Sequence, residues 1–596
     1  MLPPIAQVAE KFVFPRATTT VAKALAAKQA QTITLTGWID RKPKQISKSL
    51  TFARLRDGSG KIIQLVDTNS PSQLKSLKPD STISVEGEIE VKSNGVDLKV
   101  ASLKVLNRAN IVPSQLISET KDWPPQYRYI QLRQPNMQEV LKKRAKIVKT
   151  CREALDDQEF VEIETPLLFK STPEGAREFL IPTRKKGLMY ALPQSPQQYK
   201  QLLIASGVER YYQVAKCFRD EDLRADRQPE FTQLDLEMGF ANGSDVQQVI
   251  ESLVERVWSQ HSATKLVTLD EKQALVEATG KLGKLTYQTA IEKYGIDKPD
   301  LRSSIEIKQI PAEATTNPEY SVFEAIVLSD WTESSDIFEG LKSDKEYKNR
   351  VPTVVIFESE GQIRSIVEPL AKVDNWHDFF DTLGARPGDL VAFSDRRPAN
   401  YENPTPLGRL RQVAIALIPD CYRRTTESVG CWVHEFPLFE PSSDDTGLYP
   451  SYKWDEINST HHPFTMVKIE DYHKLEADPL SCHGQHYDLV IDGVEVGGGS
   501  TRVHDPELQK FIFEHVLKIT NSEKLFGHLL QALATGCPPH AGLAIGLDRI
   551  VAMLCGLKSL RDVIAFPKTI TGADPLIGSP SKVTKDQLKP YHVGVN

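Results

Sequence analysis

The sequence lacks the features of a membrane protein or of a small disulfide-stabilised domain. Its 596 residues include seven cysteines, which are scattered and form no C-x-x-C pair. This usage predicts reduced, mostly buried thiols in an intracellular protein. No uncharged apolar run reaches the ~18 residues needed to span a membrane, so no membrane association is expected. Internal repeats and low-complexity tracts are not visible either.

Two common nucleotide-binding motifs are also missing. There is no P-loop and no Rossmann-type G-x-G-x-x-G followed by an acidic residue. Residues 497–499 form a glycine run without the Lys-Ser/Thr that a phosphate-binding loop requires. The net charge of −6 does not exclude a polyanionic partner, which needs only a local positive face.

The chain is long enough for several domains. A prior of ~150 residues per domain predicts three or four, and an apolar fraction of 40% with 26% charged residues is ordinary for a globular protein. Pattern shifts indicate an N-terminal extension (1–30), a strand-rich segment (31–108), a hinge (109–135), two segments with catalytic-looking motifs (136–262 and 428–568) around an insertion (263–427), and a C-terminal extension (569–596).

The first 30 residues have a basic bias. Lys11, Arg16, Lys23 and Lys28 stand against the single acid Glu10. This bias is typical of what remains of a mitochondrial leader, although prolines interrupt a long helix. An ordinary terminal segment explains it almost as well.

The strand-rich segment predicts a small barrel. Ile33 and Leu35 alternate with polar residues, Asn94-Gly95 is typical of a tight turn, and residues 57–61 predict a second turn. Several short strands in about 75 residues are most economically an OB-fold. Such barrels bind nucleic acid in many proteins and are purely structural in others.

Helical spacing of apolar residues from Met137 to Asp157 predicts an amphipathic helix with a basic outer face. It leads into a predicted strand over residues 160–166 that Pro166 stops. The insertion mixes helical and strand patterns and carries no recognisable chemistry.

The densest polar cluster lies at residues 217–237. Its pattern predicts a strand, a charged loop and a second strand, with alternation resuming at Phe231. A solvated charged hairpin is the simple interpretation. Arg219, however, carries a guanidinium that can donate paired hydrogen bonds to phosphate or carboxylate oxygens.

A second stretch, GLAIGLDR at residues 542–549, reads as a glycine-rich strand that runs into a helix. Glycines let the backbone approach a ligand closely. Taken alone, the stretch is explained equally well by packing between a strand and a helix.

Together these stretches resemble the second (F-R-x-E) and third (G-L-x-x-G-x-D-R) motifs of the class II aminoacyl-tRNA synthetases. The segment ending at Pro166 matches the degenerate first motif, which builds the dimer interface in that family. The resemblance implies that Arg219 and Arg549 are catalytic, Arg219 gripping the α-phosphate of ATP and the substrate carboxylate, and Arg549 the γ-phosphate. The implied ATP-binding residues are Arg219, Asp220, Glu221, Gln228, Phe231, Glu495, Gly546, Leu547, Asp548 and Arg549.

Residues 171–177, 194–200 and 495–502 resemble the aspartyl members of the family rather than the lysyl or asparaginyl ones. The resemblance implies that Lys200 and Arg502 pair with the side-chain carboxylate of aspartate. Two desolvated cations would be left uncompensated by asparagine, and polar complementarity of this kind can discriminate by ~10⁴ or more. Lys200 alone would be read as a lysine on a helix surface. The implied aspartate-binding residues are Glu174, Ser195, Gln197, Lys200, Arg219, Asp235, His461, His462 and Arg502.

Two groups of residues raise the question of a metal. His461 and His462 suggest zinc, but adjacent positions point apart in a strand and no Cys or His partner follows at zinc-like spacing. The resemblance places this pair at the aspartate instead. Asp488 and Glu495 face each other across a predicted hairpin, and the resemblance implies that they hold the Mg²⁺ bound with ATP. A surface carboxylate pair is the alternative.

In the anticodon-binding barrel of this family an aromatic residue and a glutamine face the nucleic acid. Phe52 and Gln64 occupy the corresponding places, with Arg41 nearby. Stacking on an unpaired base contributes ~1–3 kcal/mol. The alternative puts Phe52 in the barrel core. The loop at 42–48 departs from the usual arginine-rich pattern, which leaves the anticodon contacts open.

The resemblance implies a multidomain α+β protein: a class II antiparallel-sheet catalytic domain, an N-terminal OB-fold barrel and an inserted GAD-like α+β domain. The implied partners are tRNA-Asp, L-aspartate, ATP as substrate with Mg²⁺, and a second copy of the chain in a homodimer. An enzyme that also charges tRNA-Asn and a non-catalytic relative that binds tRNA are competing hypotheses. The insertion and the basic start favour the mitochondrial matrix over the bacterial cytoplasm.

Overall fold

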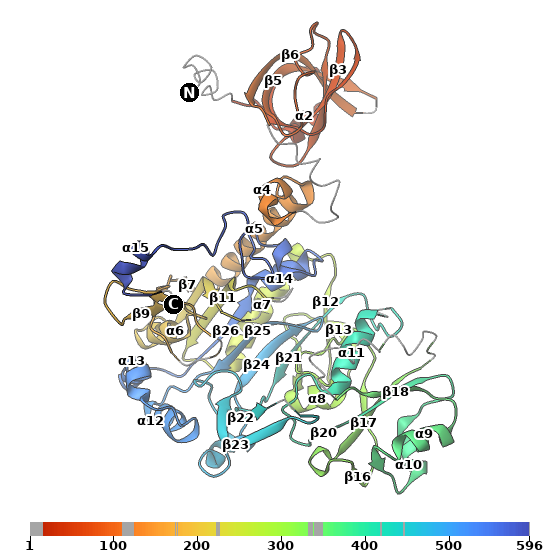
Figure 1. Cartoon of the computed structure of the whole chain (residues 1–596), viewed down its shortest axis with the longest axis vertical. Coiled ribbons are helices and arrows are strands. Elements are labelled where there is room, and N and C mark those ends of the chain that lie inside the picture. The colour runs from red at the N-terminus through yellow and green to blue at the C-terminus, as the bar shows by residue number, and fades with distance from the viewer. Residues whose placement is uncertain are drawn as a thin grey trace. The chain divides into compact units, whose positions relative to one another are not determined.

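The computed structural model describes residues 16–93, 95–109, 124–172, 175, 177–221, 227–329, 331, 338, 350–417, 420–444 and 447–594. The chain divides into two compact units, one comprising residues up to 145 together with 559–582, the other most of the remainder (Figure 1). Each unit is described by itself.

The first unit contains a closed six-stranded barrel. Its strands are β1 (Thr32–Ile39), β2 (Lys44–Ser47), β3 (Leu50–Arg56), β4 (Ile62–Asp67), β5 (Thr82–Lys92) and β6 (Gly95–Asn107). They follow the order β1-β5-β6-β4-β3-β2, and an additional pairing of β1 with β3 closes the sheet. The expected barrel and the turn at 57–61 are confirmed, while Asn94 of the other predicted turn lies outside the described residues.

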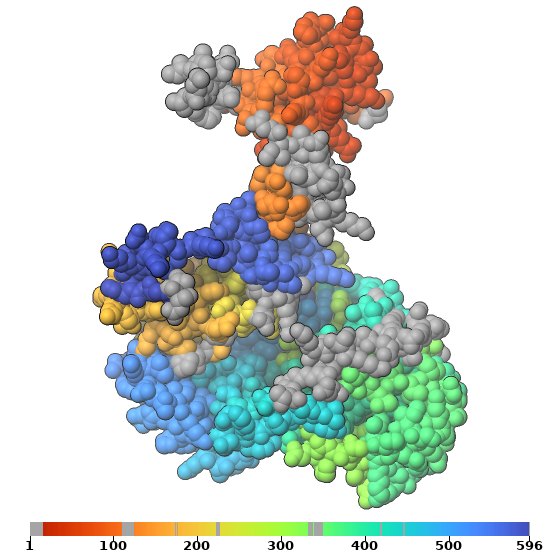
Figure 2. Space-filling model, in the orientation of Figure 1, coloured from red at the N-terminus to blue at the C-terminus, as the bar shows by residue number. Residues whose placement is uncertain are grey.

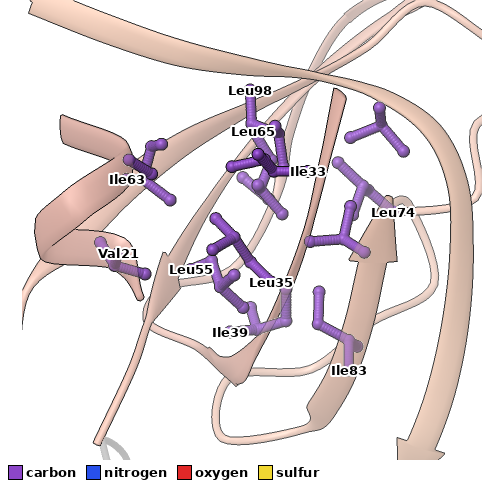
Figure 3. Close-up of a cluster of buried hydrophobic side chains, with 14 of the residues drawn as sticks. Val21, Ile33, Leu35, Ile39, Leu55, Ile63, Leu65, Leu74, Ile83 and Leu98 are labelled. Carbon is purple, nitrogen blue, oxygen red and sulfur yellow. The ribbon is translucent and has the colours of Figure 1, made fainter. Parts of the chain in front are cut away.

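The barrel interior follows from the alternation of apolar residues along its strands. Ile33, Leu35 and Ile39 of β1 are buried in one cluster with residues of the other strands, including Leu55, Leu65 and Leu98 (Figure 3). The short helix α2 (Val21–Leu25) adds Val21 and Ala24 to this core. The segment expected to be an extension therefore contributes Val21 and Ala24 to the barrel packing, because α2 covers apolar side chains that would otherwise be exposed.

Residues 124–134, expected to form a hinge, contain helical turns. The helix α4 (Arg128–Gln131) buries Arg128, whose guanidinium donates to the carbonyl oxygens of Arg561, Ile564 and Ala565 at 2.8–3.0 Å. The predicted amphipathic helix follows as α5 (Pro135–Asp156).

The second unit is built on a ten-stranded sheet. Its main path is β13-β12-β21-β24-β25-β26-β11-β10-β7, and β14 pairs with β21 (Figure 1). The strands are β7 (Val161–Glu162), β10 (Arg210–Phe218), β11 (Glu230–Gly239), β12 (Leu266–Leu269), β13 (Leu275–Glu277), β14 (Gly283–Thr286), β21 (Ser428–His434), β24 (His486–Ile491), β25 (Val494–Thr501) and β26 (His540–Gly546). The predicted strand over residues 160–166 is shorter than expected, because only Val161 and Glu162 pair with β10.

Helices and hairpins surround this sheet. The helix α7 (Gly243–His261) packs against β25 and β26, α6 (Gln197–Ala205) packs against β10 and β11, and α14 (Leu547–Leu554) follows β26 directly. The other elements are β8 (Leu180–Pro182), β9 (Met189–Ala191), β22 (Phe439–Asp444), β23 (Ser451–Ser459), α12 (Pro506–Phe511), α13 (Ser522–Ala534) and α15 (Lys585–Leu588).

The inserted segment carries a second sheet, in the order β15-β17-β20-β18. The segment begins with strands of the large sheet (β12 to β14), and its own sheet begins at Ile307. In Figure 2 its residues, coloured green, gather into a lobe of their own. Its elements are α8 (Tyr287–Tyr294), β15 (Ile307–Gln309), β16 (Ala314–Thr315), β17 (Val322–Leu328), β18 (Thr353–Ile356), α9 (Glu360–Val367), β19 (Ala371–Lys372), α10 (Trp376–Leu383), β20 (Leu390–Arg396) and α11 (Pro406–Leu417).

The cysteines follow the expectation from composition. All seven cysteines are free thiols, and five of them are buried. Among the described residues, no helix combines the length and the apolar character that crossing a bilayer requires.

Candidate active site

One face of the large sheet is polar. Residues directly opposite each other in antiparallel strands place their side chains on the same face. The register Asp235↔Ala544↔Gly498↔Asp488 therefore puts both carboxylates on one face, and Glu237↔Gly542↔Ser500↔His486 adds the next row. The opposite face carries Leu234, Leu236 and Leu543 and is apolar.

Four charged side chains form a buried cluster on the polar face, the ion-pair quartet (Lys200, Asp235, Glu237 and Arg502). The Lys200 ammonium lies 2.8 Å from Asp235 and 2.9 Å from Glu237, and Arg502 Nε donates to Glu237 at 3.0 Å. All four residues are at most 5% exposed. Sequence reasoning assigned no role to Glu237, and it expected that asparagine would leave Lys200 and Arg502 uncompensated. In the structure, two carboxylates on β11 pair with these cations.

The quartet reverses the usual effect of burial on Glu237. Burial raises the pKa of this carboxyl, but Arg502 and then Lys200 outweigh burial and lower the pKa to about 2. Asp235 differs: burial raises its pKa, and Lys200 opposes this only in part. Gly542 leaves the space that Glu237 occupies, since a Cβ there would lie 1.9 Å from Glu237 Oε2.

A chain of amides extends the quartet along α6. Gln197 Nε2 donates to Gln201 Oε1 at 3.2 Å, and Gln201 Nε2 lies 3.0 Å from His540 Nε2. His540 Nδ1 lies 2.9 Å from the Pro538 carbonyl oxygen, so Nδ1 carries the proton and Nε2 accepts. Ser195 is half-buried in the turn before this helix. Glu174 lies outside the described residues.

The predicted nucleotide end of the site lies on the β10–β11 hairpin. The Arg219 guanidinium lies over the Phe231 ring, 5.2 Å from its centroid, and Arg219 Nε is buried with no hydrogen-bond partner among the described residues. Asp220 pairs with Arg177 at 2.7 Å and Glu221 with Arg227 at 3.3 Å. Gln228 is buried. Burial and then Asp235 raise the pKa of the Cys217 thiol, and Arg219 and Lys200 both oppose this rise, which places the two cations around one thiol.

The third predicted motif, which includes the first turn of α14, contacts this hairpin. Asp548 Oδ2 accepts a hydrogen bond at 2.8 Å from the backbone N–H of Thr232, beside Phe231. Gly546 caps the helix, Leu547 is buried, and Arg549 donates from Nη1 to the Glu495 carbonyl oxygen. The third motif therefore reaches both β11 and β25.

A β-bulge brings Glu495 to the polar face. The β24–β25 register pairs Leu489 with Gly497 but Val490 with Glu495, so one residue of β25 is skipped. Without this shift Glu495 would lie on the face opposite Asp488, because side chains alternate along a strand. Glu495 raises the pKa of Asp488 in addition to the effect of burial, so the two carboxylates interact.

Two residues that sequence reasoning missed accompany these carboxylates. His486 Nε2 lies 2.8 Å from Asp488 Oδ1, and Lys298 Nζ lies 3.7 Å from Glu495 Oε2. Burial raises the pKa of Glu495, but Lys298 and Arg549 outweigh burial and lower it. Burial lowers the pKa of the His486 imidazole to about 3, so this side chain is neutral.

The histidine pair lies in a bend after β23 and not in the strand that sequence reasoning assumed. The rings of His461 and His486 stack with centroids 3.5 Å apart and planes 7° apart. With Asp488 they form a group whose ligand atoms lie within 4.8 Å of one another. His462 turns instead towards the buried Phe464, with ring centroids 4.4 Å apart. His486 comes from β24, 25 residues after His461, and therefore lies outside the zinc-like spacing considered in the sequence.

The residues predicted to read the anticodon lie on the outside of the barrel. Burial alternates along β3, so Thr51, Ala53 and Leu55 face inward and Phe52 is half-exposed outside the core. Gln64 on the neighbouring strand is exposed and donates to Asp97 Oδ2 at 3.2 Å. The Arg41 side chain is 77% exposed. The alternative that Phe52 belongs to the core is thus excluded by its position.

The chain matches two family models. Residues 120–570 match the class II tRNA synthetases (D, K and N), and residues 33–106 match the OB-fold nucleic acid binding domain. It is 46% identical to the mitochondrial aspartate–tRNA ligase of Saccharomyces cerevisiae, over 98% of this chain and 95% of the relative. It is 37% identical to the aspartate–tRNA(Asp/Asn) ligase of Opitutus terrae, over 94% and 96%.

A solved structure supports the fold. A crystal structure from Leishmania major Friedlin, assigned as an aspartyl-tRNA synthetase, superposes with a TM-score of 0.57 at 16% identity. The match covers 93% of this chain and 95% of that one. The α+β architecture with a barrel and a large antiparallel sheet is therefore that of known structures.

Proposed function

Because the chain belongs to the aspartate–tRNA ligases of the class II synthetase family, we propose that it activates L-aspartate with ATP and transfers it to the 3′ end of tRNA-Asp. The observation that carries this proposal is the ion-pair quartet beside the Arg219 hairpin. The quartet offers both signs of charge to an amino acid. Arg219 Nε, which has no hydrogen-bond partner among the described residues, can donate to a phosphate.

The chemistry has two steps. The aspartate α-carboxylate attacks the α-phosphorus of ATP, the bond to pyrophosphate breaks, and aspartyl-adenylate forms. The terminal ribose hydroxyl of tRNA then attacks the acyl carbon and AMP leaves. No protein nucleophile is needed, so Arg219 and Arg549 act by holding the reactants in line and neutralising phosphate charge.

Aspartate is selected by an exchange of ion pairs in the quartet. The substrate ammonium replaces Lys200 as the partner of Asp235. The substrate side-chain carboxylate then pairs with Lys200 and Arg502. Asparagine supplies the ammonium but no carboxylate, so it would separate Lys200 from Asp235 without replacing the lost anion. Gln197, Ser195, His461, His462 and Glu174 complete the proposed aspartate site.

Mg²⁺ fits the pair formed by Asp488 and Glu495. Both offer hard oxygen donors on the same face of the sheet, beside Arg549. Bound there with ATP, the ion would supply further neutralisation of phosphate charge. Asp220, Glu221, Gln228 and Phe231 are proposed to hold the rest of the nucleotide, together with the first turn of α14.

The barrel is proposed to bind the anticodon through Phe52, Gln64 and Arg41. Replacing Phe52 with alanine should raise the KM for tRNA by about tenfold or more, since stacking contributes ~1–3 kcal/mol. Aspartate-dependent exchange between pyrophosphate and ATP should not change, because it involves no tRNA. An equal loss in both assays would contradict a role in tRNA binding.

A homodimer is proposed from the surface around the β8–β9 hairpin. The exposed residues lie on this hairpin and in the segment just before Phe169, which pairs with it, and they are 42–58% exposed: Leu167, Leu168, Leu180, Leu188, Met189 and Tyr190. Exposed apolar residues gathered in this way are typical of an interface. Light scattering should show a dimer, and Leu168→Asp with Leu188→Asp should shift it to a monomer.

The mitochondrial matrix is the proposed location. The support is the mitochondrial relative in yeast and the basic bias of the first residues. Protease protection in isolated mitochondria would test this, and bacterial cytoplasm is the alternative.

The decisive experiment is aspartate-dependent exchange of label between pyrophosphate and ATP. Arg219→Ala should abolish it, while Lys216→Ala, at an exposed residue of β10 three positions before Arg219, should retain it. Near-normal exchange in Arg219→Ala would refute the proposal. No exchange in the unaltered protein would favour a non-catalytic relative.

A second candidate function is the charging of tRNA-Asn as well, because the Opitutus terrae relative bears that activity in its name. Charging purified tRNA-Asp and tRNA-Asn side by side decides between the two.

A further inference from the structure

Lys298 reaches the nucleotide end of the site from the inserted segment. It follows α8, yet its ammonium lies 3.7 Å from Glu495 and 3.7 Å from Asp297. Its side chain is 39% exposed, so it is neither free in solvent nor fully enclosed. None of the family motifs in the sequence includes this residue.

The loop that carries Lys298 is fixed at both ends. Gly295 has a φ of 68° and packs against Gly408 of α11, where a Cβ on Gly295 would lie 2.4 Å from the Gly408 Cα. On the other side Arg302 pairs with Asp300 at 2.7 Å and with Asp492 at 3.5 Å. The loop is therefore held between the insertion and the β24–β25 turn.

A buried cation strengthens this anchoring. Arg411 of α11 donates to the carbonyl oxygens of Asp300 and Ile305, both at 2.7 Å. Asp297 N–H donates to Asn403 Oδ1 at 3.3 Å. Because backbone atoms on both sides of Lys298 are held, its position is set by the fold and not by chance contact of a long side chain.

The charges around Lys298 show what it compensates. Burial lowers the pKa of its ammonium, but Asp297, Glu495 and Asp488 together outweigh burial and raise it. Three carboxylates thus stabilise the charge of one lysine, while the nearby positive charge of Arg549 opposes them. When a divalent cation binds Asp488 and Glu495, Lys298 loses its role as their counter-ion and becomes available to another anion.

We propose that Lys298 is a further ATP-binding residue, delivered by the inserted segment, that neutralises Asp488 and Glu495 in the free enzyme and binds the β,γ-phosphate end of ATP once the metal is bound. This inference rests on the proposed function of the site. It gives the insertion a part in the activation step through the 3.7 Å approach of Lys298 to Glu495.

The test uses the full-length protein and calorimetry. In Lys298→Ala, the Kd of Mg²⁺ alone should fall, because the carboxylates lose their resident cation. The Kd of pyrophosphate with Mg²⁺ should rise by about tenfold or more, as expected for loss of a charge-assisted contact. The Kd of AMP should not change, because AMP lacks the β- and γ-phosphates.

Two variants control the result. Lys298→Arg should restore pyrophosphate binding, because the charge is kept. Lys293→Ala, in the last turn of α8, should behave like the unaltered chain in every titration. In exchange assays Lys298→Ala should raise the KM for ATP. The KM for aspartate should stay within about twofold, because Lys298 contacts the ATP side of the site and is not part of the ion-pair quartet.

Unchanged pyrophosphate binding in Lys298→Ala would overturn the inference, and so would equal weakening of pyrophosphate and AMP. These outcomes are distinct from failure of the proposed function, which would appear as a lack of exchange in the unaltered protein.

Discussion

The large sheet and the sheet of the insertion each bury a glutamate on a strand, with opposite results. Glu237 on β11 contacts Lys200 and Arg502, and these cations lower its pKa to about 2. Glu324 on β17 contacts Arg396 at 2.9 Å, and burial raises its pKa to about 7. Both glutamates are 0% exposed, so burial alone does not decide the charge state.

The cations in direct contact make the difference. At Glu324 burial outweighs the contacting Arg396 and the further influence of Arg350, and Asp395 adds to the rise in pKa. At Glu237 an ammonium and a guanidinium are both in contact, and together they outweigh burial. A carboxylate that two cations keep ionised is a constant charge that can help to select a substrate. A buried carboxylate that titrates near neutral pH makes the free energy of unfolding depend on pH.

The largest effect is expected for Glu237→Ala. It leaves Arg502 without its carboxylate and Lys200 with only Asp235, and breaking a buried pair costs about 3–5 kcal/mol. Exchange activity should be lost, and the urea midpoint should fall. Glu209→Ala, an exposed residue before β10, is the control. A loss below about 1 kcal/mol would mean that solvent enters the quartet and compensates the cations.

The next largest effect concerns pH and Glu324. Its pKa is raised from 4.5 to about 7, so the folded state binds the proton more tightly than the unfolded state in this range. The unfolding free energy should therefore be highest below pH 4.5 and fall by about 3 kcal/mol as the pH rises through 7.

Glu324→Gln should remove this part of the pH dependence, because glutamine does not titrate. The pair with Arg396 is lost at every pH, which shifts the whole curve but not its slope. Urea unfolding at several pH values measures the slope. An identical slope in both proteins would mean that Arg396 keeps Glu324 ionised, like Glu237.

The smallest effect is expected for Gly542→Ala. The new Cβ would lie 1.9 Å from Glu237 Oε2 and 2.4 Å from the Leu236 carbonyl oxygen, so the carboxylate and the backbone of β11 must both shift. Overpacking of this kind costs about 1–3 kcal/mol, and the KM for aspartate should rise more than the KM for ATP. Gly361→Ala in α9, where a Cβ meets nothing within 4 Å, should be neutral or slightly stabilising. Equal KM changes for both substrates would contradict a local effect on the quartet.

Local patterns predicted the scaffold well. Alternation of apolar residues predicted the barrel, and a glycine-rich strand followed by helical spacing predicted β26 and α14. The partners of Lys200 could also have been predicted from the sequence. Asp235 and Glu237 alternate with Leu234 and Leu236 on one strand, and two acids on one face of a buried strand require cations.

Other parts of the site could not be read locally. Lys298 and His486 join Asp488 and Glu495 through tertiary packing, and no spacing in the sequence relates them. The bulge that turns Glu495 to the polar face also leaves no sequence signal, because a register shift changes pairing and not composition. The roles of these residues remain predictions.

The anchoring of the Lys298 loop also limits how far this chain could be shortened. A minimal catalyst made by cutting out all of residues 263–427 would lose three strands of the main sheet together with Lys298, the proposed phosphate ligand. A shortened enzyme would have to begin its deletion beyond Ile305 and still keep Arg411 and Gly408 in place. The insertion therefore cannot be treated as a separate domain that could be removed without affecting the candidate active site.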